Sequence, residues 1–183
     1  MCSLSRLLPQ EVHMAEHENS VGESDDWFTP RKYFDAIGLT FDLDPAHPGL
    51  GTPHCHVPAR RVLTLADDGL SQPWGEDLVF LNSPYGARRG HVPWLQKLIA
   101  HNNGIGLFRA YTSADWFHDA LLPARAVLMF PRGKIKFVRP DGSIGKQPGH
   151  GNVFVGLGDV ACAALLAVPL KIGVCWDRRS SRW

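Results

Sequence analysis

The segment Leu78-Val79-Phe80-Leu81-Asn82-Ser83-Pro84-Tyr85 joins a continuous apolar run to a polar turn. A short apolar run that ends in a turn predicts a strand buried on both faces. In open α/β sheets, ligands bind beyond the carboxyl ends of the strands. The segment therefore predicts an α/β fold with Asn82-Ser83-Pro84-Tyr85 at its active site. An ordinary Asn-Ser-Pro turn is the alternative interpretation.

Predicted strands alternate with predicted helices along the chain, which indicates a mostly parallel sheet with helices on both faces and an antiparallel end. We expect strands at residues 39–43, 62–65, 77–82, 104–109, 125–130, 134–138, 152–157 and 171–176. We expect helices at residues 30–37, 92–101, 113–121 and 160–167. Thr29 is predicted to cap the first helix, with Pro30 as its first residue. The last helix is apolar all round, so a buried strand is its alternative.

The chain of 183 residues is long enough for one domain with a full core. Residues 1–24 show no sustained hydrophobic period and are predicted to form a disordered arm. We expect the domain at residues 25–177, followed by a basic tail at 178–183. The Pro/Gly-rich stretch at 140–151 is interpreted as a surface loop.

Five motifs in a fixed order carry a family resemblance. They are Trp27-Phe28-Thr29-Pro30, Phe41-Asp42-Leu43-Asp44-Pro45-Ala46, Asp67-Asp68-Gly69-Leu70, the quartet at Asn82, and Gly133-Lys134-Ile135-Lys136-Phe137. Together they resemble the phage-type DNA N6-adenine methyltransferases, small S-adenosylmethionine-dependent enzymes with an Asn/Asp-Pro-Pro-Tyr motif. The resemblance covers roughly residues 26–176 and implies a single Rossmann-like domain. One departure is Ser83, where the family usually has proline.

The resemblance implies roles for the quartet. The N6 lone pair of adenine is delocalised into the ring, so two acceptors must hold its hydrogens. The side-chain oxygen of Asn82 and the main-chain carbonyl of Ser83 are the expected acceptors, while Pro84 stiffens the turn and Tyr85 stacks on the base. The target base must then be flipped out of a duplex or lie in a single strand. Phe137 or Trp116 would supply a second aromatic wall, unless they are core residues.

Cofactor contacts are also implied by the resemblance. Trp27, Thr29 and Pro30 belong to a loop that covers the methionine end of S-adenosylmethionine. Carboxylates suit its cationic and hydroxylated groups. The expected contacts are Asp44 as first choice, Asp42 as second, Ala46 in the same turn, and Asp68 at the cofactor adenine with Asp67 in reserve. Taken singly, these motifs are also good helix starts and Asp-Pro or Asp-Gly turns.

Composition limits the DNA-binding surface. The net charge of +1 is not that of a dedicated nucleic-acid binder, so a DNA footprint must be local. The candidates are Arg88, Arg89, Arg132, Lys134, Lys136, Phe137 and Arg139, with Arg178, Arg179 and Arg182 in the tail. The alternative for each basic residue is a solvated charged face. Asp44 and Asn82 are only 38 positions apart, which predicts an abbreviated cofactor half, no separate target-recognition domain and a short recognition sequence.

The four cysteines have no paired spacing, and no signal peptide or long apolar span is evident. We therefore expect free thiols in a reducing, cytoplasmic compartment. His54-Cys55-His56 does not predict a metal site, because adjacent ligands in one short loop rarely close a tetrahedral zinc site. A monomer or weak dimer is expected.

The predicted activity is adenine N6 methylation in DNA. Cytosine N4 poses the same electronic problem, so base identity depends on the resemblance alone. Two further alternatives are a non-catalytic relative that binds DNA or cofactor, suggested by Ser83, and an unrelated α/β binding module. The second has little support, because the chain contains no phosphate-loop or Gly-x-Gly-x-x-Gly pattern.

Overall fold

The computed structural model describes residues 27–49, 51–84, 90–145 and 148–180. These residues form seven strands, three α-helices and three shorter helical turns. The strands are β1 (Phe41–Asp44), β2 (Ala59–Val62), β3 (Val79–Leu81), β4 (Gly104–Arg109), β5 (Val127–Pro131), β6 (Asn152–Leu157) and β7 (Gly173–Asp177). The helices are α1 (Arg31–Ile37), α2 (Val92–His101) and α3 (Asp159–Leu166), and the turns are η1 (Leu65–Asp67), η2 (Phe117–Leu121) and η3 (Leu122–Ala124).

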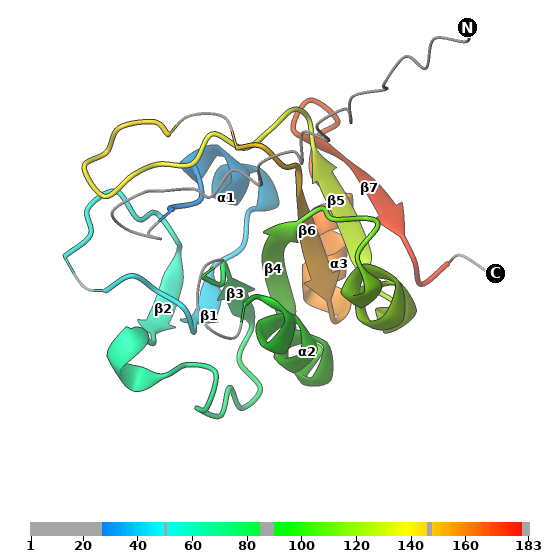
Figure 1. Cartoon of the computed structure of the whole chain (residues 1–183), viewed down its shortest axis with the longest axis horizontal. Helices are drawn as coiled ribbons and strands as arrows, with labels where there is room; N and C mark the ends of the chain where they lie inside the picture. Colours follow the sequence, from blue (N-terminus) through cyan, green and yellow to red (C-terminus); the bar gives the residue numbers. More distant parts are fainter. Residues whose placement is uncertain (1–26, 50, 85–89, 146–147, 181–183) are drawn as a thin grey trace, which may run out of the picture.

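All seven strands form one sheet in the order β2-β1-β3-β4-β6-β5-β7, from one end of Figure 1 to the other. The pairs from β2 to β4 are parallel, whereas β6 pairs antiparallel with both β4 and β5, and β7 pairs antiparallel with β5. Five strands thus point one way, and β6 and β7 point the other. This arrangement confirms the predicted α/β fold with an antiparallel end, and the sheet is parallel from β2 to β4.

Helices cover both faces of the sheet. Side chains alternate between two cores along the central strands, as a pleated sheet requires: Ile105 and Leu107 enter one core and Phe108 the other. The first core also contains the apolar sides of α1 and α3, and the second contains those of α2 and η2. At Gly106 a Cβ atom would lie 2.6 Å from a methyl carbon of Leu98, so the missing side chain lets α2 pack closely on β4.

The half of the sheet that contains β1, β2 and β3 is abbreviated, as predicted. In the described part of the chain, β1 connects to β2 through irregular turns, and β2 connects to β3 through the single turn η1. In contrast, β3 connects to β4 through the full helix α2. No α-helix therefore lies between β1, β2 and β3 in the described part of the chain.

Three local predictions were wrong. The strand expected at 62–65 lies at Ala59–Val62. It is an edge strand whose arginines face solvent, so no run of apolar residues marks its position in the sequence. Residues 134–138 alternate between buried and exposed but do not join the sheet; Val138 instead bridges Phe28 and Ile144. Thr29 does not cap α1. Pro30 has an extended ψ of 138° and is itself the N-cap, so the helix begins one residue later than predicted.

Candidate active site

The carboxyl ends of β1 and β3 lie side by side, because Leu43 pairs with Val79 in parallel register. Asp44 ends β1, and Asn82 and Ser83 directly follow β3. The acidic turn and the quartet, which are separated in sequence, therefore meet at one edge of the sheet. This is the edge at which open α/β sheets bind their ligands.

The side chain of Asn82 is held in one orientation. Its Nδ2 donates a hydrogen bond of 2.8 Å to the main-chain carbonyl of Trp27. A carbonyl can only accept, so the amide nitrogen must face Trp27 and the oxygen must point away. That oxygen, Oδ1, is buried and has no partner among the described residues. The structure therefore presents a fixed, unused acceptor at this position.

Two further hydroxyls are buried without a partner in the described part of the chain. Thr29 is 2% exposed and Ser83 is 1% exposed, and neither side-chain oxygen has a hydrogen-bond partner there. Each belongs to a segment that contributes to the Asn82–Trp27 hydrogen bond. Buried polar groups in proteins are normally paired, so these unpaired groups fit a polar ligand.

The segment that begins at Trp27 is fixed by a distant loop. Phe28 exchanges two main-chain hydrogen bonds with Val138, of 2.9 and 3.0 Å. At Gly145 a Cβ atom would lie 2.4 Å from the indole of Trp27, so only glycine lets the loop approach this ring. The guanidinium of Arg139 lies 5.7 Å from the centre of the same ring. The entry motif, the quartet and the 137–145 loop thus form one continuous structure.

Asp44 is a buried carboxyl group, 3% exposed. Burial raises the pKa of Asp44 to about 7, and the hydrogen bond from the Ala46 main-chain amide, 3.0 Å from Oδ1, opposes that rise. A carboxylate at this position is thus costly to the free protein, and a cationic ligand would stabilise it. The Asp44 site therefore suits an ammonium or sulfonium group.

The second-choice acids have structural partners of their own. Asp42 forms an ion pair with Arg60 at 2.7 Å and accepts the Leu78 main-chain amide at 3.0 Å. Asp67 accepts two hydrogen bonds of 2.8 Å from Thr64 and closes a capping box at η1. These contacts leave Asp44 and Asp68 as the better candidates for ligand contacts.

Asp68 lies on a loop that is packed against the turn after β1. At Gly69 a Cβ atom would fall 1.9 Å from the main-chain oxygen of Pro45, so the two segments touch directly. Lys97 of α2 fixes the other side of this loop: its ammonium donates to the carbonyls of Gly69 (3.3 Å), Leu70 (2.7 Å) and Gln72 (2.5 Å). Lys97 was not among the site residues predicted from the sequence. The available signal was its position three residues after Trp94, on the same face of a helix.

The ring of Trp74 completes this attachment. The Lys97 ammonium lies 4.7 Å from the centre of the Trp74 ring, and the Trp74 indole nitrogen donates to the Gly69 carbonyl at 2.9 Å. Burial lowers the pKa of Lys97, and the charge of Asp68 opposes that decrease. The loop that presents Asp68 is therefore positioned from the helix that follows the quartet.

Other predicted site residues are placed differently. Phe137 is 6% exposed and belongs to the core that contains α1, which confirms the alternative of a core residue. Trp116 is half-buried, with its ring centre 4.7 Å from that of His91. Lys134 and Lys136 are exposed. Tyr85, Arg88 and Arg89 lie outside the described residues, whereas Pro84 is half-buried.

The predicted basic tail begins with two anchored side chains. Arg178 donates two hydrogen bonds, of 3.1 and 2.9 Å, to the carbonyl of Leu122. Arg179 forms an ion pair with Asp177 at 3.0 Å. Both arginines therefore have intramolecular roles at the end of β7.

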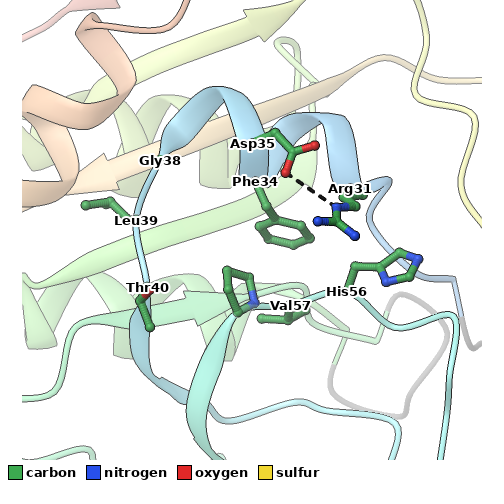
Figure 2. Close-up of a pocket in the computed structure, with 9 residues that line it drawn as sticks. Arg31, Phe34, Asp35, Gly38, Leu39, Thr40, His56 and Val57 are labelled. Carbon is green, nitrogen blue, oxygen red and sulfur yellow. Dashed lines mark ion pairs between the residues drawn. The ribbon is translucent and has the colours of Figure 1, made fainter.

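A cavity of about 430 Å³ lies beside α1, lined by residues such as Arg31, Phe34 and His56 (Figure 2). Its rim contains the Arg31–Asp35 ion pair, at 3.5 Å. The lining comes from α1 and from the segments that precede β1 and β2. Asp44 and Asn82 lie at the carboxyl ends of strands instead, so this cavity is separate from the candidate active site.

A family model described as DNA N-6-adenine-methyltransferase (Dam) matches residues 17–154. The chain belongs to this family. As a member of the Dam family, it is an adenine-specific DNA methyltransferase, and the matched region contains every residue of the site described above. No curated protein and no solved structure gives a significant match to the chain.

Other features of this Dam family member concern metals, thiols and membranes. Among the described residues, no three His, Cys, Asp or Glu side chains are grouped so that they could hold a metal ion. Cys55, Cys162 and Cys175 are free thiols, and burial raises the pKa of Cys55 to about 11. The described helices are all too short or too polar to cross a bilayer.

Proposed function

We propose that the chain transfers a methyl group from S-adenosylmethionine directly to adenine N6, with the target base flipped out of a duplex or presented in a single strand. The observation that carries this proposal is the Asn82 side chain. Its amide nitrogen is anchored on Trp27 at 2.8 Å, and its oxygen is buried without a partner among the described residues. An amino group with two hydrogens is the natural partner for such an acceptor.

The residues around Asn82 fit the methyl donor. S-adenosylmethionine carries an ammonium, a sulfonium and hydroxyl groups, and it supplies an electrophilic methyl group when bound. Asp44 offers a buried carboxyl group whose pKa is raised by burial. Thr29 and Ser83 offer buried hydroxyls with no partner in the described part of the chain. Asp68 is exposed on the loop that Lys97 holds against the turn after β1, where it would meet the cofactor's adenine.

The protein's catalytic contribution is to orient the amino group. The Asn82 oxygen and the Ser83 carbonyl would accept the two N6 hydrogens, which favours a pyramidal nitrogen whose lone pair points out of the ring plane. This nitrogen would attack the sulfonium methyl carbon in line, so that the N–C bond forms as the C–S bond breaks and the thioether product leaves. The methylated nitrogen would then lose one proton to water, and no covalent enzyme intermediate would form. Tyr85 is assigned to stack on the base by family resemblance. Positioning of this kind supplies a large part of the rate of a two-substrate reaction.

The abbreviated cofactor half suggests a minimal enzyme. We infer that sequence preference is short and is read by the loops at 87–93 and 140–151. Sequencing of methylated sites in mixed DNA tests this inference. A long, strict recognition sequence would contradict it.

The experiment that tests the activity is transfer of labelled methyl from S-adenosylmethionine to mixed-sequence DNA, followed by digestion to nucleosides. We expect label in N6-methyladenine for the wild type and a loss of about 100-fold or more for Asn82→Ala. Asn103→Ala is the matched control. Asn103 also donates its amide to a main-chain carbonyl, that of Glu76 at 2.9 Å, but it precedes β4 and so lies at the opposite edge of the sheet.

Other results would change the proposal in defined ways. Label in N4-methylcytosine would keep the site and correct the base. Cofactor binding without any label would mean that Ser83 marks a non-catalytic relative. Equal losses of methyl transfer in Asn82→Ala and Asn103→Ala would show that Asn82 has no specific role in catalysis.

A further inference from the structure

An aromatic pair lies just beyond the paired ends of β4 and β6. Arg109 is level with Asn152 in the antiparallel register, and the Ala110 amide donates to the Gly151 carbonyl at 2.9 Å. The same register places Tyr111 opposite His150, and their ring centres are 5.7 Å apart in an edge-to-face arrangement. The pair thus continues the sheet at its ligand-binding edge.

Two cations flank these rings. The guanidinium of Arg109 lies 5.8 Å from the centre of the Tyr111 ring. Lys134 donates to the carbonyl of Gly149, next to His150, at 3.1 Å. Burial, followed by the charges of Arg109 and Lys134, lowers the pKa of His150 to about 4. His150 is therefore a neutral ring at neutral pH, within a locally positive field.

Tyr111 is accessible, whereas most aromatic side chains of the described residues are not. Its exposed fraction is 39%. Among the described residues, the other large apolar side chains with so high an exposed fraction are all aliphatic. An exposed ring beside a cation is well suited to bind a planar group that carries negative charge nearby.

The pair lies at the same edge of the sheet as Asn82. Leu81, directly before Asn82, is level with Gly106 in the parallel register of β3 and β4, so both strands end at the same edge of the sheet. Neighbouring strands are about 4.8 Å apart. A polymer whose one unit enters the site at Asn82 would therefore run past the neighbouring end of β4, where Tyr111 lies.

We propose that Arg109, Tyr111, Lys134 and His150, here called the Tyr111 platform, dock the DNA strand next to the target adenine. A flanking base stacks on Tyr111, and the adjoining phosphates contact Arg109 and Lys134. This inference rests on the proposed function, because the strand that it positions is the one that delivers its adenine to Asn82.

DNA chemistry matches this surface better than a protein or a small metabolite does. Each nucleotide pairs a flat base with a phosphate, as the platform pairs a ring with a cation. Stacking on an aromatic ring tolerates any base, so the platform would position the strand without reading its sequence. This agrees with the short recognition sequence proposed above.

The test is fluorescence anisotropy of a labelled single-stranded oligodeoxynucleotide against the wild type, Tyr111→Ala, Tyr111→Phe and Lys134→Gln. We expect about tenfold weaker binding for Tyr111→Ala and near wild-type binding for Tyr111→Phe, which keeps the ring. Lys134→Gln should lower the slope of log affinity against log salt by about 1. Arg125→Asn is the charge control, because Arg125 is exposed before β5, at the opposite edge of the sheet.

A steady-state measurement separates docking from folding. In Tyr111→Ala, the KM for DNA should rise while the KM for S-adenosylmethionine and the thermal unfolding midpoint stay unchanged. Wild-type binding by Tyr111→Ala, or an equal effect of Arg125→Asn and Lys134→Gln, would overturn the platform. So would a wild-type protein that does not bind the oligonucleotide. If the wild type binds DNA through Tyr111 but transfers no methyl group, the platform stands and the proposed function fails.

Discussion

The side-chain amide of Asn82 and the main-chain carbonyl of Trp27, 55 residues apart in sequence, form a hydrogen bond of 2.8 Å. This bond joins the entry motif to the quartet. It also decides which atom of the Asn82 amide is offered to a ligand, because the carbonyl can accept only from nitrogen. The free oxygen is therefore a consequence of the tertiary structure.

Asn82→Asp should keep an acceptor for the target amino group but lose the donor to Trp27. A carboxylate would face the Trp27 carbonyl, and the two acceptors would repel each other. We expect methyl transfer to fall about tenfold or more, yet to remain above that of Asn82→Ala. Initial rates of labelled methyl transfer at saturating cofactor measure this order. Activity of Asn82→Asp equal to that of the wild type would show that the anchor on Trp27 is not needed.

Ser83→Ala should leave the free protein as stable as the wild type, or stabilise it by about 1 kcal/mol, because it removes a buried hydroxyl without a described partner. Catalysis should be retained if the main-chain carbonyl is the acceptor. Urea denaturation and methyl-transfer rates together test this prediction. Ser71→Ala is the control, since the Ser71 hydroxyl donates to the Asp68 carbonyl at 2.9 Å and its loss should destabilise slightly. A collapse of activity in Ser83→Ala would assign the hydroxyl itself a role.

Asp44 should make the stability of the free protein depend on pH. Its pKa is raised by burial from 3.8 to about 7. The stability that comes from keeping Asp44 protonated is thus fully present below about pH 4 and is lost as the pH rises to about 7. The free energy of unfolding should fall by on the order of 4 kcal/mol over this pH range. Asp44→Asn, which can still accept the Ala46 amide, should remove this dependence and stabilise the free protein at pH 8.

Denaturation curves between pH 5 and pH 8 without cofactor measure the Asp44 effect. Asp35→Asn is a suitable control, because Asp35 is exposed. In the described part of the chain, its one ion-pair partner is Arg31, which is also exposed. Asp44→Asn should also bind S-adenosylmethionine more weakly in calorimetry, whereas Asp35→Asn should not. Identical pH profiles for Asp44→Asn and the wild type would rule out a protonated Asp44 in the free protein.

Lys97→Met should loosen the loop that presents Asp68. The substitution removes three hydrogen bonds to carbonyls and a cation–π contact with Trp74, at a cost of about 2 kcal/mol. We expect the KM for S-adenosylmethionine to rise more than kcat falls, because the loop is assigned to the cofactor. Lys32→Met is the matched control: Lys32 lies 5.0 Å from the Tyr33 ring centre but is exposed. A fall in kcat with an unchanged KM would place Lys97 outside cofactor binding.

Sequence patterns predicted the central elements best. The bounds of α2, β4 and β6 agree with the structure residue for residue, because each has a strong apolar pattern between clear end signals such as Asn102-Asn103-Gly104. Edge elements were predicted less well. β2 is marked by arginines that pair with Asp42 and Asp77 rather than by apolar residues. Apolar and polar residues alternate at 134–138 because one side of this segment is buried. Its backbone, however, pairs with Phe28 and Ile144 and not with a strand of the sheet.

The sequence by itself determined the chemistry of this protein. The order of its motifs indicated the family, the fold class and the quartet at Asn82, because strand ends and turn residues leave local patterns. The tertiary structure alone decided which polar atoms are used and which are free. It paired Asn82 with Trp27, Asp42 with Arg60 and Lys97 with the Asp68 loop, and it placed Tyr111 opposite His150. Such pairings depend on strand register and burial, which bring together groups that no local pattern relates.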